Sequence, residues 1–464
     1  MSEFSISWTP DIDKSAGPVY LAIADALSAD IQSGRLAGGT RLPPQRTLAE
    51  ILGIDFTTVS RAYTEARRRG LVEGKVGQGT YVRAKRPFAH GAPLPSGLVD
   101  MSMNLPPRFD DAGLIARMWR SFDELEADGG IDLLLRYQEP GGTGRDRAAG
   151  VGWLSSRLEG LSTDRVLVCP GAQGALLALA GALAAPGDTI CTESLTYPGF
   201  LSLAAHLRLQ LAAVAGDAEG PIPEAFDKLC IERRPKAFYC NPTIQNPTTL
   251  TIPLKRRQQL AAIARHHHVP IIEDDAYGAL PTAPVAPFAA IAPDIVYHVA
   301  GLAKCLAPAL RIAYLVVPDN RAAIRLAGAI RAAASMASPV TALIATKWIE
   351  DGTADAVLAA IRDEAGARQR LAAQILPPEL MRTDPEGFHF WLHLPRPWTR
   401  GEFVARLRSV GIGVVTSDAF AVASPPEAVR IGLGAPPSHA ELEQGLRAMA
   451  DLLAQPPAMS SLII

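Results

Sequence analysis

Cysteine is scarce in this chain, with five residues in 464, and no two of them form a Cys-x-x-Cys pair. That scarcity excludes a disulfide-stapled scaffold and a cysteine-based zinc module, and it predicts buried, reduced thiols. Long apolar runs are missing as well, since no stretch approaches the roughly 20 uninterrupted apolar residues that span a bilayer. The first fifteen residues are mixed and acidic and lack the apolar core of a signal peptide. We therefore expect a cytoplasmic protein with no membrane partner.

A strong overall charge is also absent, because 45 Lys and Arg residues nearly balance 47 Asp and Glu residues. The balance hides a local excess: residues 35–86 hold eleven basic and four acidic side chains. A basic segment attached to an acidic remainder is typical of a modular DNA-binding protein. The same pattern fits a solvated basic face, so charge alone leaves both interpretations open.

Residues 18–83 have the pattern of a compact unit with three helices and a hairpin. The first helix is indicated by apolar residues at helical spacing, namely Leu21, Ala24, Leu27 and Ile31. A short helix at about 47–52 and a longer one at about 57–69 are expected next. The pattern of residues 71–82 indicates a β-hairpin with a glycine-rich tip. Elements in this order predict a winged helix-turn-helix.

Residues 84–97 contain three prolines and two glycines without periodicity, which predicts a linker. Over residues 98–464, helical patterns alternate with short apolar runs, so we expect an α/β fold with a mostly parallel sheet between helices. The expected strands of a large domain, at about 98–330, are Val166–Val168, Thr189–Cys191, Ala237–Cys240, Ile271–Ile272, Ile295–His298 and Ile312–Val316. Those of a smaller α+β domain, at about 331–464, are Phe388–Leu392, Gly413–Thr416 and Val429–Leu433.

Chemically reactive residues follow several of the expected strands. Asp274 comes directly after the run Ile271–Ile272, and Lys304 follows the run that ends near His298. Because ligands of α/β sheets bind beyond the carboxyl ends of the strands, these side chains are expected to converge. Taken singly, each has an ordinary explanation as a solvated lysine or a capping aspartate. Their order along the chain therefore decides the interpretation.

That order resembles the type I pyridoxal 5'-phosphate (PLP) enzymes of the aminotransferase superfamily. The matching motifs are Gly171-Ala172-Gln173, Tyr197-Pro198-Gly199, Asn246-Pro247-Thr248, Asp274-x-x-Tyr277, Lys304 and Arg311. The resemblance covers essentially all of residues 98–464. It implies the type I aminotransferase fold and PLP as the cofactor.

The resemblance also implies a role for each motif. Lys304 is then the catalytic lysine that forms the internal aldimine, and Asp274 pairs with the pyridine nitrogen. Tyr277 and Asn246 are expected to hydrogen-bond the ring oxygen O3′, while Tyr197 stacks on the ring face. The phosphate is expected to bind the backbone at the helix N-terminus, formed by Gly171, Ala172 and Gln173. Its other expected partners are the guanidinium of Arg311 and Tyr137 of a neighbouring subunit. The last of these implies a homodimer.

Two further residues are expected to contact an effector. By the same resemblance, Arg430 grips an acidic group, usually an α-carboxylate. His389 lies on a strand that could face the site, with packing in the core or at an interface as the alternative. Hydroxyl groups are missing where the family often has them, at Gly301, Ala303 and Ala172, and Thr249 replaces a frequent glycine. We expect a phosphate cup poor in hydroxyls that still binds PLP.

Residues 18–82 resemble the GntR-type winged helix. The match runs through Gly34–Arg46, Leu48-Ala49, Leu52-Gly53, Thr57-Thr58-Val59, Gly70-Leu71-Val72 and Gly77–Val82. It implies that the helix beginning at Thr57 enters the major groove of DNA. The expected DNA-binding residues are Arg46, Thr57, Thr58, Ser60, Arg61, Lys75, Gly77 and Gln78. Asp55 and Phe56 depart from the pattern, because an arginine often precedes the threonine pair.

A GntR-type module joined to an aminotransferase-like module is similar to the MocR subfamily of bacterial GntR regulators. The preferred hypothesis is a regulator that binds double-stranded operator DNA and senses a small amine or amino acid through aldimine exchange at Lys304. Two alternatives stay open: a working aminotransferase with an accessory DNA-binding domain, and a DNA-binding protein that responds to PLP itself. The tract His266–His268 has no cysteine or carboxylate at ligand spacing, so we predict no metal site.

Overall fold

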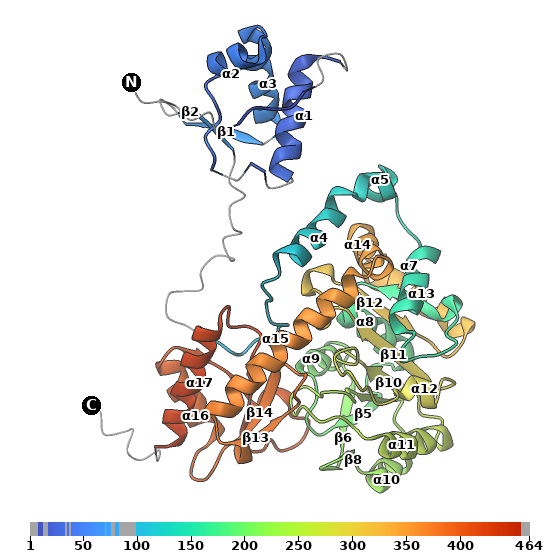
Figure 1. Ribbon diagram of the computed structural model, residues 1–464. Helices are drawn as coiled ribbons and strands as arrows, with labels where there is room; N and C mark the ends of the chain where they lie inside the picture. Colours follow the sequence, from blue (N-terminus) through green and yellow to red (C-terminus); the bar gives the residue numbers. More distant parts are fainter. Residues whose placement is uncertain are drawn as a thin grey trace. The chain divides into compact units, whose positions relative to one another are not determined.

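The computed structural model describes residues 8–12, 17–32, 35–36, 39–69, 71–75, 79–82 and 99–455. The chain divides into two units, residues 1–96 and residues 97–464, whose elements are labelled in Figure 1. The predicted linker at 84–97 lies outside the described residues. None of the helices within these ranges has both the length and the apolar character needed to cross a bilayer.

The first unit has the predicted order of three helices and a hairpin. Its elements are α1 (Val19–Gln32), α2 (Gln45–Leu52), α3 (Phe56–Arg68), β1 (Val72–Lys75) and β2 (Gly79–Val82), and the two strands pair antiparallel. Gly53 ends α2 in the left-handed conformation. Asp55 caps α3 by accepting a hydrogen bond from the backbone N–H of Thr57 at 2.8 Å. This tight turn between α2 and α3 completes the helix-turn-helix.

The core of the first unit begins earlier in the chain than the predicted start at residue 18. Helix α3 buries the face that carries Val59 and Tyr63, at the spacing of one helix turn. Trp8 is buried in the same cluster, and its indole N–H donates to Asp30 at 2.7 Å. Residues around Trp8 have neither helical nor alternating periodicity, so the sequence pattern did not indicate this contribution.

A seven-stranded sheet forms the centre of the second unit. Its strands are β4 (Val166–Cys169), β5 (Thr189–Glu193), β6 (Gln210–Val214), β9 (Ala237–Cys240), β10 (Ile271–Asp274), β11 (Val296–Gly301) and β12 (Ala313–Val316). They lie in the order β4-β12-β11-β10-β9-β5-β6. Strand β12 is antiparallel to both of its neighbours, and all other pairs are parallel. The predicted mostly parallel sheet is confirmed.

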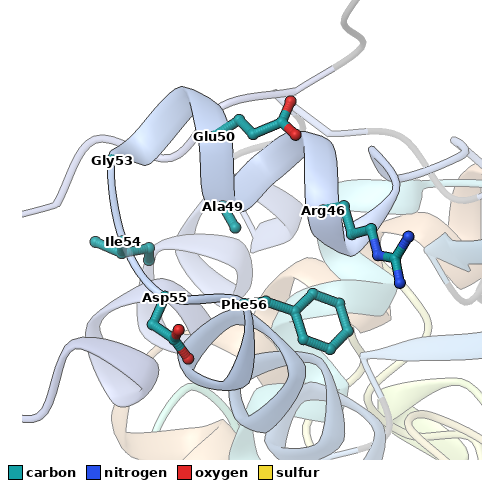
Figure 2. A pocket seen from close by; sticks show the side chains of 7 residues that line it. All are labelled: Arg46, Ala49, Glu50, Gly53, Ile54, Asp55 and Phe56. Carbon is teal, nitrogen blue, oxygen red and sulfur yellow. The ribbon is translucent and has the colours of Figure 1, made fainter.

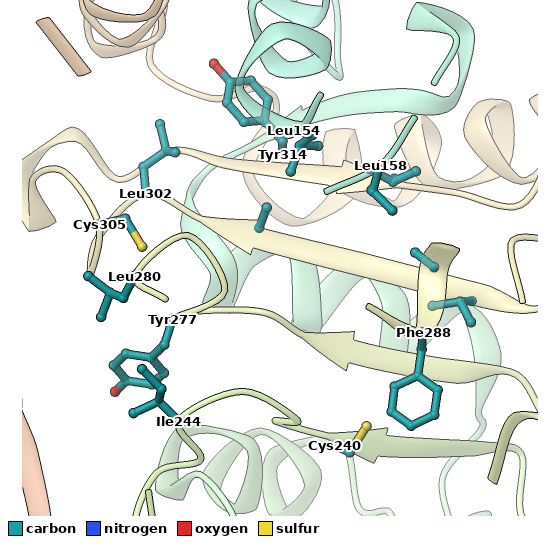
Figure 3. Packing of buried hydrophobic residues seen from close by; sticks show 14 of the residues in the cluster. Leu154, Leu158, Cys240, Ile244, Tyr277, Leu280, Phe288, Leu302, Cys305 and Tyr314 are labelled. Atoms are coloured by element: carbon teal, nitrogen blue, oxygen red, sulfur yellow. The ribbon is translucent and has the colours of Figure 1, made fainter. Parts of the chain in front are cut away.

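Helices cover both faces of this sheet, so the side chains of each strand alternate between two cores. On β4, Val166 and Val168 belong to one cluster and Leu167 and Cys169 to the other. Figure 3 shows part of the first cluster against the strands. The helices that contribute to the first cluster include α7 (Gly144–Leu154), α10 (Pro223–Arg233), α11 (Leu254–His266), α12 (Phe288–Ile291) and α14 (Pro339–Glu350). Those of the second are α8 (Gly171–Leu183), α9 (Pro198–His206) and α13 (Asn320–Ala334).

A second sheet forms the smaller part of this unit. It holds β13 (Met381–Thr383), β14 (His389–His393), β17 (Ala428–Gly432) and β16 (Val415–Thr416), all antiparallel, and it packs with α16 (Arg400–Ser409) and α17 (His439–Leu453). Further elements of the second unit are α4 (Ala112–Asp123), α5 (Leu125–Gly129), α6 (Asp132–Leu135), β7 (Gly216–Asp217) and β8 (Gly220–Pro221).

Two features of the second unit differ from the sequence prediction. The single strand expected at 413–416 is split: β15 (Ile412–Gly413) pairs with β3 (Val99–Asp100), while β16 joins the sheet. The large part extends beyond residue 330, because α14 buries Trp348 in a large-part core and α15 (Thr353–Ile375) passes from that core to the small one. Both differences come from contacts between residues far apart in the chain.

Glu273 joins three elements beneath the end of β10. Its buried carboxylate accepts hydrogen bonds from the backbone N–H groups of Phe288 at 2.7 Å and Ala289 at 3.0 Å, at the start of α12. It also contacts Nδ1 of the buried His298, on the neighbouring strand β11, at 2.8 Å. A buried carboxylate with several donors holds its partners in place and leaves them unsatisfied when it is removed.

Replacing this carboxylate tests its structural role. We expect Glu273→Ala to lower the free energy of unfolding by about 3 kcal/mol, because two N–H groups and a histidine lose their acceptor. Urea denaturation of the two proteins measures the difference. The matched control is Glu232→Ala, whose exposed side chain makes only a 3.8 Å ion pair with Lys228; it should change stability by less than about 0.5 kcal/mol. Equal effects of the two substitutions would contradict the assignment.

Candidate functional site

The predicted site residues gather beyond the carboxyl ends of the parallel strands. Asp274 is the last residue of β10, and Lys304 follows β11 by three residues. Gly171 opens α8 immediately after β4, and Asn246 lies in the loop after β9. Arg430, from the small part, donates a hydrogen bond to Oδ1 of Asn246 at 3.2 Å. The site therefore lies where the large and small parts of the second unit meet.

Asp274 is a buried carboxylate with one oxygen unpartnered. Its Oδ2 accepts a hydrogen bond from the Tyr239 hydroxyl at 2.7 Å, whereas Oδ1 has no partner among the described residues. Burial raises the pKa of this carboxyl to about 6, against the lowering effect of the Tyr239 hydrogen bond. A buried polar atom without a partner costs free energy unless a ligand supplies one. The geometry favours a cationic N–H donor at Oδ1.

Lys304 is half-buried, and its amine is shielded from solvent. Burial is the main cause that lowers the pKa of its ammonium group to about 8, with the Arg430 guanidinium as the second cause and Asp274 opposing both. Its Nζ donates a hydrogen bond to the backbone carbonyl of Asn104. The lowered pKa leaves a substantial neutral fraction near physiological pH, and the neutral amine is the nucleophile that attacks carbonyl groups.

Asn104 belongs to the site although nothing in the sequence pattern singled it out. Its Nδ2 donates to the Tyr277 hydroxyl at 2.8 Å, its carbonyl accepts from Lys304, and its buried Oδ1 has no partner among the described residues. Because Tyr277 accepts from Asn104, its own hydroxyl proton stays available for another acceptor. Asn104 lies 173 positions from Tyr277 in the chain, so only the fold reveals the contact.

Arg430 is a buried cation facing this cluster. Besides its contact with Asn246, it donates to the backbone carbonyl of Ser102, and its guanidinium lies 5.3 Å from the ring centroid of Phe420. Its Nε is buried and has no partner among the described residues. Burial lowers the pKa of the guanidinium, with Tyr277 opposing the shift. A charge this poorly compensated favours an anionic ligand.

His389 is fully buried and also lies at the site. Its Nε2 is 3.2 Å from the backbone carbonyl of Gln245, its ring centroid is 5.5 Å from that of Tyr277, and Nδ1 lacks a partner among the described residues. Burial, followed by the Arg430 charge, lowers the pKa of the imidazole to about 3. His389 is therefore packed in the interior beside Tyr277, and its contact with an effector stays a prediction.

The start of α8 forms a cradle of small residues. Gly171 adopts a φ of +74° and lies against the backbone of Arg311. A Cβ on Gly301 would come within 3.2 Å of the Ala172 Cβ, so the end of β11 approaches α8 closely. Gln173 donates from Nε2 to the carbonyl of Gly199 at 2.9 Å, whereas its buried Oε1 lacks a partner among the described residues. Backbone N–H groups at such a helix start bind phosphate.

Tyr197 caps the start of α9 beside this cradle. A Cβ on Gly199 would come within 2.4 Å of the Tyr197 ring, so the glycine permits the ring position. Burial raises the pKa of the Tyr197 hydroxyl, the negative charge of Asp274 adds to the rise, and Arg311 opposes it. The charges of both Asp274 and Arg311 therefore act on the Tyr197 hydroxyl.

Buried polar atoms without partners are concentrated in this site. Seven such side-chain atoms occur among the described residues, and five of them belong to the residues above: Asn104 Oδ1, Gln173 Oε1, Asp274 Oδ1, His389 Nδ1 and Arg430 Nε. Native interiors pair nearly all buried polar atoms, so such a cluster indicates where a polar ligand completes the hydrogen bonding.

Tyr137 does not join the other site residues within one chain. It follows the short helix α6, and 87 % of its surface is exposed. Three apolar side chains just before it, Ile131, Leu134 and Leu135, are also exposed. An exposed apolar group of this kind marks an interaction surface.

The predicted DNA-binding residues of α3 have several local partners. The Thr57 hydroxyl donates to Asp55, and the Arg61 guanidinium lies 4.3 Å from the ring centroid of Tyr20 on α1. Thr58 and Ser60 are half-buried. Arg61 is exposed, with its guanidinium over the Tyr20 ring, and Thr57 contributes to the helix cap.

The turn between α2 and α3 forms an open hollow. Figure 2 shows its lining, which consists of Arg46, Ala49, Glu50, Gly53, Ile54, Asp55 and Phe56. The Arg46 guanidinium lies 6.0 Å from the ring centroid of Phe56. Lys75 ends β1, while Gly77 and Gln78 lie outside the described residues.

Comparisons with known proteins give the family of both units. Residues 125–449 match the family described as aminotransferase class I and II, and residues 19–82 match bacterial regulatory proteins of the gntR family. The uncharacterised HTH-type transcriptional regulator YdeF of Bacillus subtilis is 30 % identical over 455 residues, which is 97 % of both chains. The probable rhizopine catabolism regulatory protein MocR of Rhizobium meliloti is 28 % identical and covers 67 % of this chain, with 68 % of its own length aligned.

Solved structures agree with the fold of the second unit. LysN, the α-aminoadipate aminotransferase of Thermus thermophilus, in complex with N-(5'-phosphopyridoxyl)-L-leucine, has a TM-score of 0.69 at 21 % identity over 79 % of this chain and 94 % of its own. Kynurenine aminotransferase of Pyrococcus horikoshii has a TM-score of 0.70 at 22 % identity over 80 % and 93 %. Together, these matches place the chain in the aminotransferase class I and II family and, with its gntR-type module, in the MocR subfamily of GntR-type transcriptional regulators.

Proposed function

We propose that this regulator holds PLP at Lys304, binds operator DNA through its winged helix, and responds to an amine effector that carries an acidic group. The observation that carries the proposal is the set of five buried, unpartnered polar atoms at the end of the parallel strands. Both donors and acceptors occur in the set, on one carboxylate, two amides, one imidazole and one guanidinium. A ligand with a cationic ring nitrogen, an amine and an anionic end complements them.

The residues present fit PLP by their chemistry. Asp274 would pair with the pyridine nitrogen, Tyr277 and Asn246 with the ring oxygen, and Tyr197 would stack on the ring. The phosphate would be held by the N-terminus of α8 and Arg311. When bound, PLP supplies an aldehyde that reacts reversibly with amines and a ring that withdraws electrons. Lys304 is the chain's own amine for that aldehyde, and its low pKa keeps it reactive.

Arg430 restricts the chemistry of the effector. Its buried charge and unpartnered Nε require an anionic group, which a carboxylate or a sulfonate supplies. His389 is neutral, so it adds a hydrogen bond without adding charge. The effector must also carry a primary amine that replaces Lys304. Amino acids and comparable acidic amines satisfy both conditions.

Residues 99–104 contact both Arg430 and Lys304. In the proposal, this segment passes a change at the site to the DNA-binding unit. The carbonyl of Ser102 accepts from Arg430, and the carbonyl of Asn104 accepts from Lys304. A ligand that engages Arg430 and replaces Lys304 competes with both contacts. In sequence, the segment directly follows residues 83–98, which connect to the winged helix. An effector acts through this segment only if it prefers one of its arrangements.

Homodimer formation is part of the proposal. The exposed apolar residues Ile131, Leu134 and Leu135 form a surface that a second copy would cover, and Tyr137 continues it. In this arrangement Tyr137 reaches the phosphate of the partner's site. A cytoplasmic location follows from binding operator DNA.

A working aminotransferase is the second candidate. It is favoured by one observation: the buried carboxylate of Asp274 and the reactive amine of Lys304 are both in place. Steady-state turnover with an amino donor and a keto acid distinguishes the two functions. Sustained cycling at enzyme-like rates would overturn the sensor proposal, whereas a response of DNA binding without turnover supports it.

Replacing Lys304 tests the cofactor site. We expect the PLP-loaded protein to show the visible absorbance of a PLP–lysine Schiff base, and Lys304→Ala to lose it, because Lys304 is the lysine that contacts Asn104 and interacts with the charges of Asp274 and Arg430. Borohydride reduction and peptide mass spectrometry should locate the adduct on Lys304. The control Lys236→Ala removes an exposed lysine and should keep the band. A wild-type protein without a band after PLP addition would contradict the proposal.

The pKa of Lys304 predicts how PLP capture depends on pH. Its value of about 8 lies below the ordinary 10.5, so the neutral, reactive amine accumulates as the pH rises through about 8. The capture rate of PLP by the apo-protein should therefore rise with a midpoint near pH 8 and then level off. Stopped-flow absorbance measures it, with a free lysine derivative as the control. A midpoint near that of free lysine would show that burial does not tune this amine.

Arg430 is expected to select acidic effectors. Arg430→Gln should weaken binding of an acidic amine by about tenfold to 100-fold, because a charge-assisted hydrogen bond contributes about 1.5–3 kcal/mol. The matched amine without its carboxylate should bind wild type and variant with similar, low affinity. The shift of the absorbance band during titration gives both affinities. Equal losses for both amines would mean that Arg430 supports the site without contacting the acidic group.

A further inference from the structure

Phe56 is an exposed aromatic residue at the first position of α3. Its exposed fraction is 44 %, whereas Val59 and Tyr63 on the same helix are buried. The hydrophobic core of the first unit does not include Phe56 among its described members or among the residues packed against them. The Arg46 guanidinium lies 6.0 Å from the centroid of the Phe56 ring. The fold therefore does not need this ring for core packing.

Two of the polar groups beside Phe56 are carboxylates, which are poorly suited to bind phosphate. Asp55 carries a negative charge, and its carboxylate accepts from both the N–H and the hydroxyl of Thr57. Glu50 adds a second carboxylate to the same hollow; Figure 2 shows the Phe56 ring on the Arg46 side of this turn. Contacts to the DNA backbone come mainly from cationic and neutral donors, so in this turn Arg46 suits a phosphate, whereas the two carboxylates and the apolar Phe56 ring do not.

The first turn of a recognition helix is the part that meets base edges in the major groove. An aromatic ring has no hydrogen bond to offer there, so it discriminates between bases by apolar contact. Thymine is the only base that presents a methyl group in the major groove. We infer that Phe56 reads the 5-methyl group of a thymine in each half of the operator. The inference rests on the proposed DNA-binding function and names a specificity-determining residue for it.

The test begins with the full-length, PLP-loaded protein and a random-sequence duplex pool, from which bound sequences are selected. Each thymine of the selected consensus is then replaced singly by deoxyuridine, which removes only the methyl group. At one thymine per half-site, we expect the wild-type protein to lose about fourfold in affinity, the effect of one buried methyl group. Phe56→Ala should bind the thymine and deoxyuridine duplexes equally at that position.

Two further variants separate base reading from a general loss of structure. Phe56→Leu keeps an apolar side chain and should still prefer thymine, even if the alanine variant folds poorly. Ile51→Ala removes an exposed apolar side chain of α2 and should retain the full wild-type preference. The inference is overturned if no deoxyuridine weakens wild-type binding, or if Phe56→Ala discriminates as well as wild type does. Failure of the wild-type protein to bind any duplex would instead overturn the proposed DNA-binding function itself.

Discussion

The second unit depends on how β10 places two adjacent carboxylates on opposite faces of one buried sheet. Glu273 faces the side where α12 and His298 supply three partners. Its carboxylate oxygens are therefore occupied by contacts that stabilise the fold. Asp274 faces the other way and receives only the Tyr239 hydroxyl from the described residues. Side-chain alternation along a strand makes this division unavoidable. One carboxylate stabilises the sheet, and the next is left with an oxygen for a ligand.

Features whose signal lies within a short stretch of the chain could be predicted from the sequence. Short apolar runs between helical patterns indicated the parallel sheet, and the rule that ligands bind at the carboxyl ends of strands brought Asp274, Lys304 and Gly171 together. The turn Gly53–Asp55 and the apolar spacing of the first helix likewise indicated the helix-turn-helix. In each case the signal lies within a few residues of the element it describes.

Residues 99–104 show what the sequence could not indicate. Val99 and Asp100 pair with β15, more than 300 positions later, and Asn104 reaches both Tyr277 and Lys304. Nothing in the composition or periodicity of this segment marks it as part of a site, because its role depends on partners supplied by the folded chain. The same holds for Trp8, which enters the core of the first unit from a segment without periodicity. Long-range pairing, not local propensity, decides these positions.

The shortage of hydroxyl groups in the phosphate cradle follows from packing. The Cβ position of Gly301 lies 3.2 Å from the Ala172 Cβ, so a serine at residue 301 would crowd a serine at residue 172. Any side chain at residue 301 would be tight against residue 172, so Gly301 allows β11 and α8 to approach closely. In the proposed function, the phosphate would therefore be held by the backbone N–H groups of α8 and the charge of Arg311. A cradle of this kind relies on charge and on the helix N-terminus, so its hold on phosphate weakens with ionic strength more than a hydroxyl-rich one would.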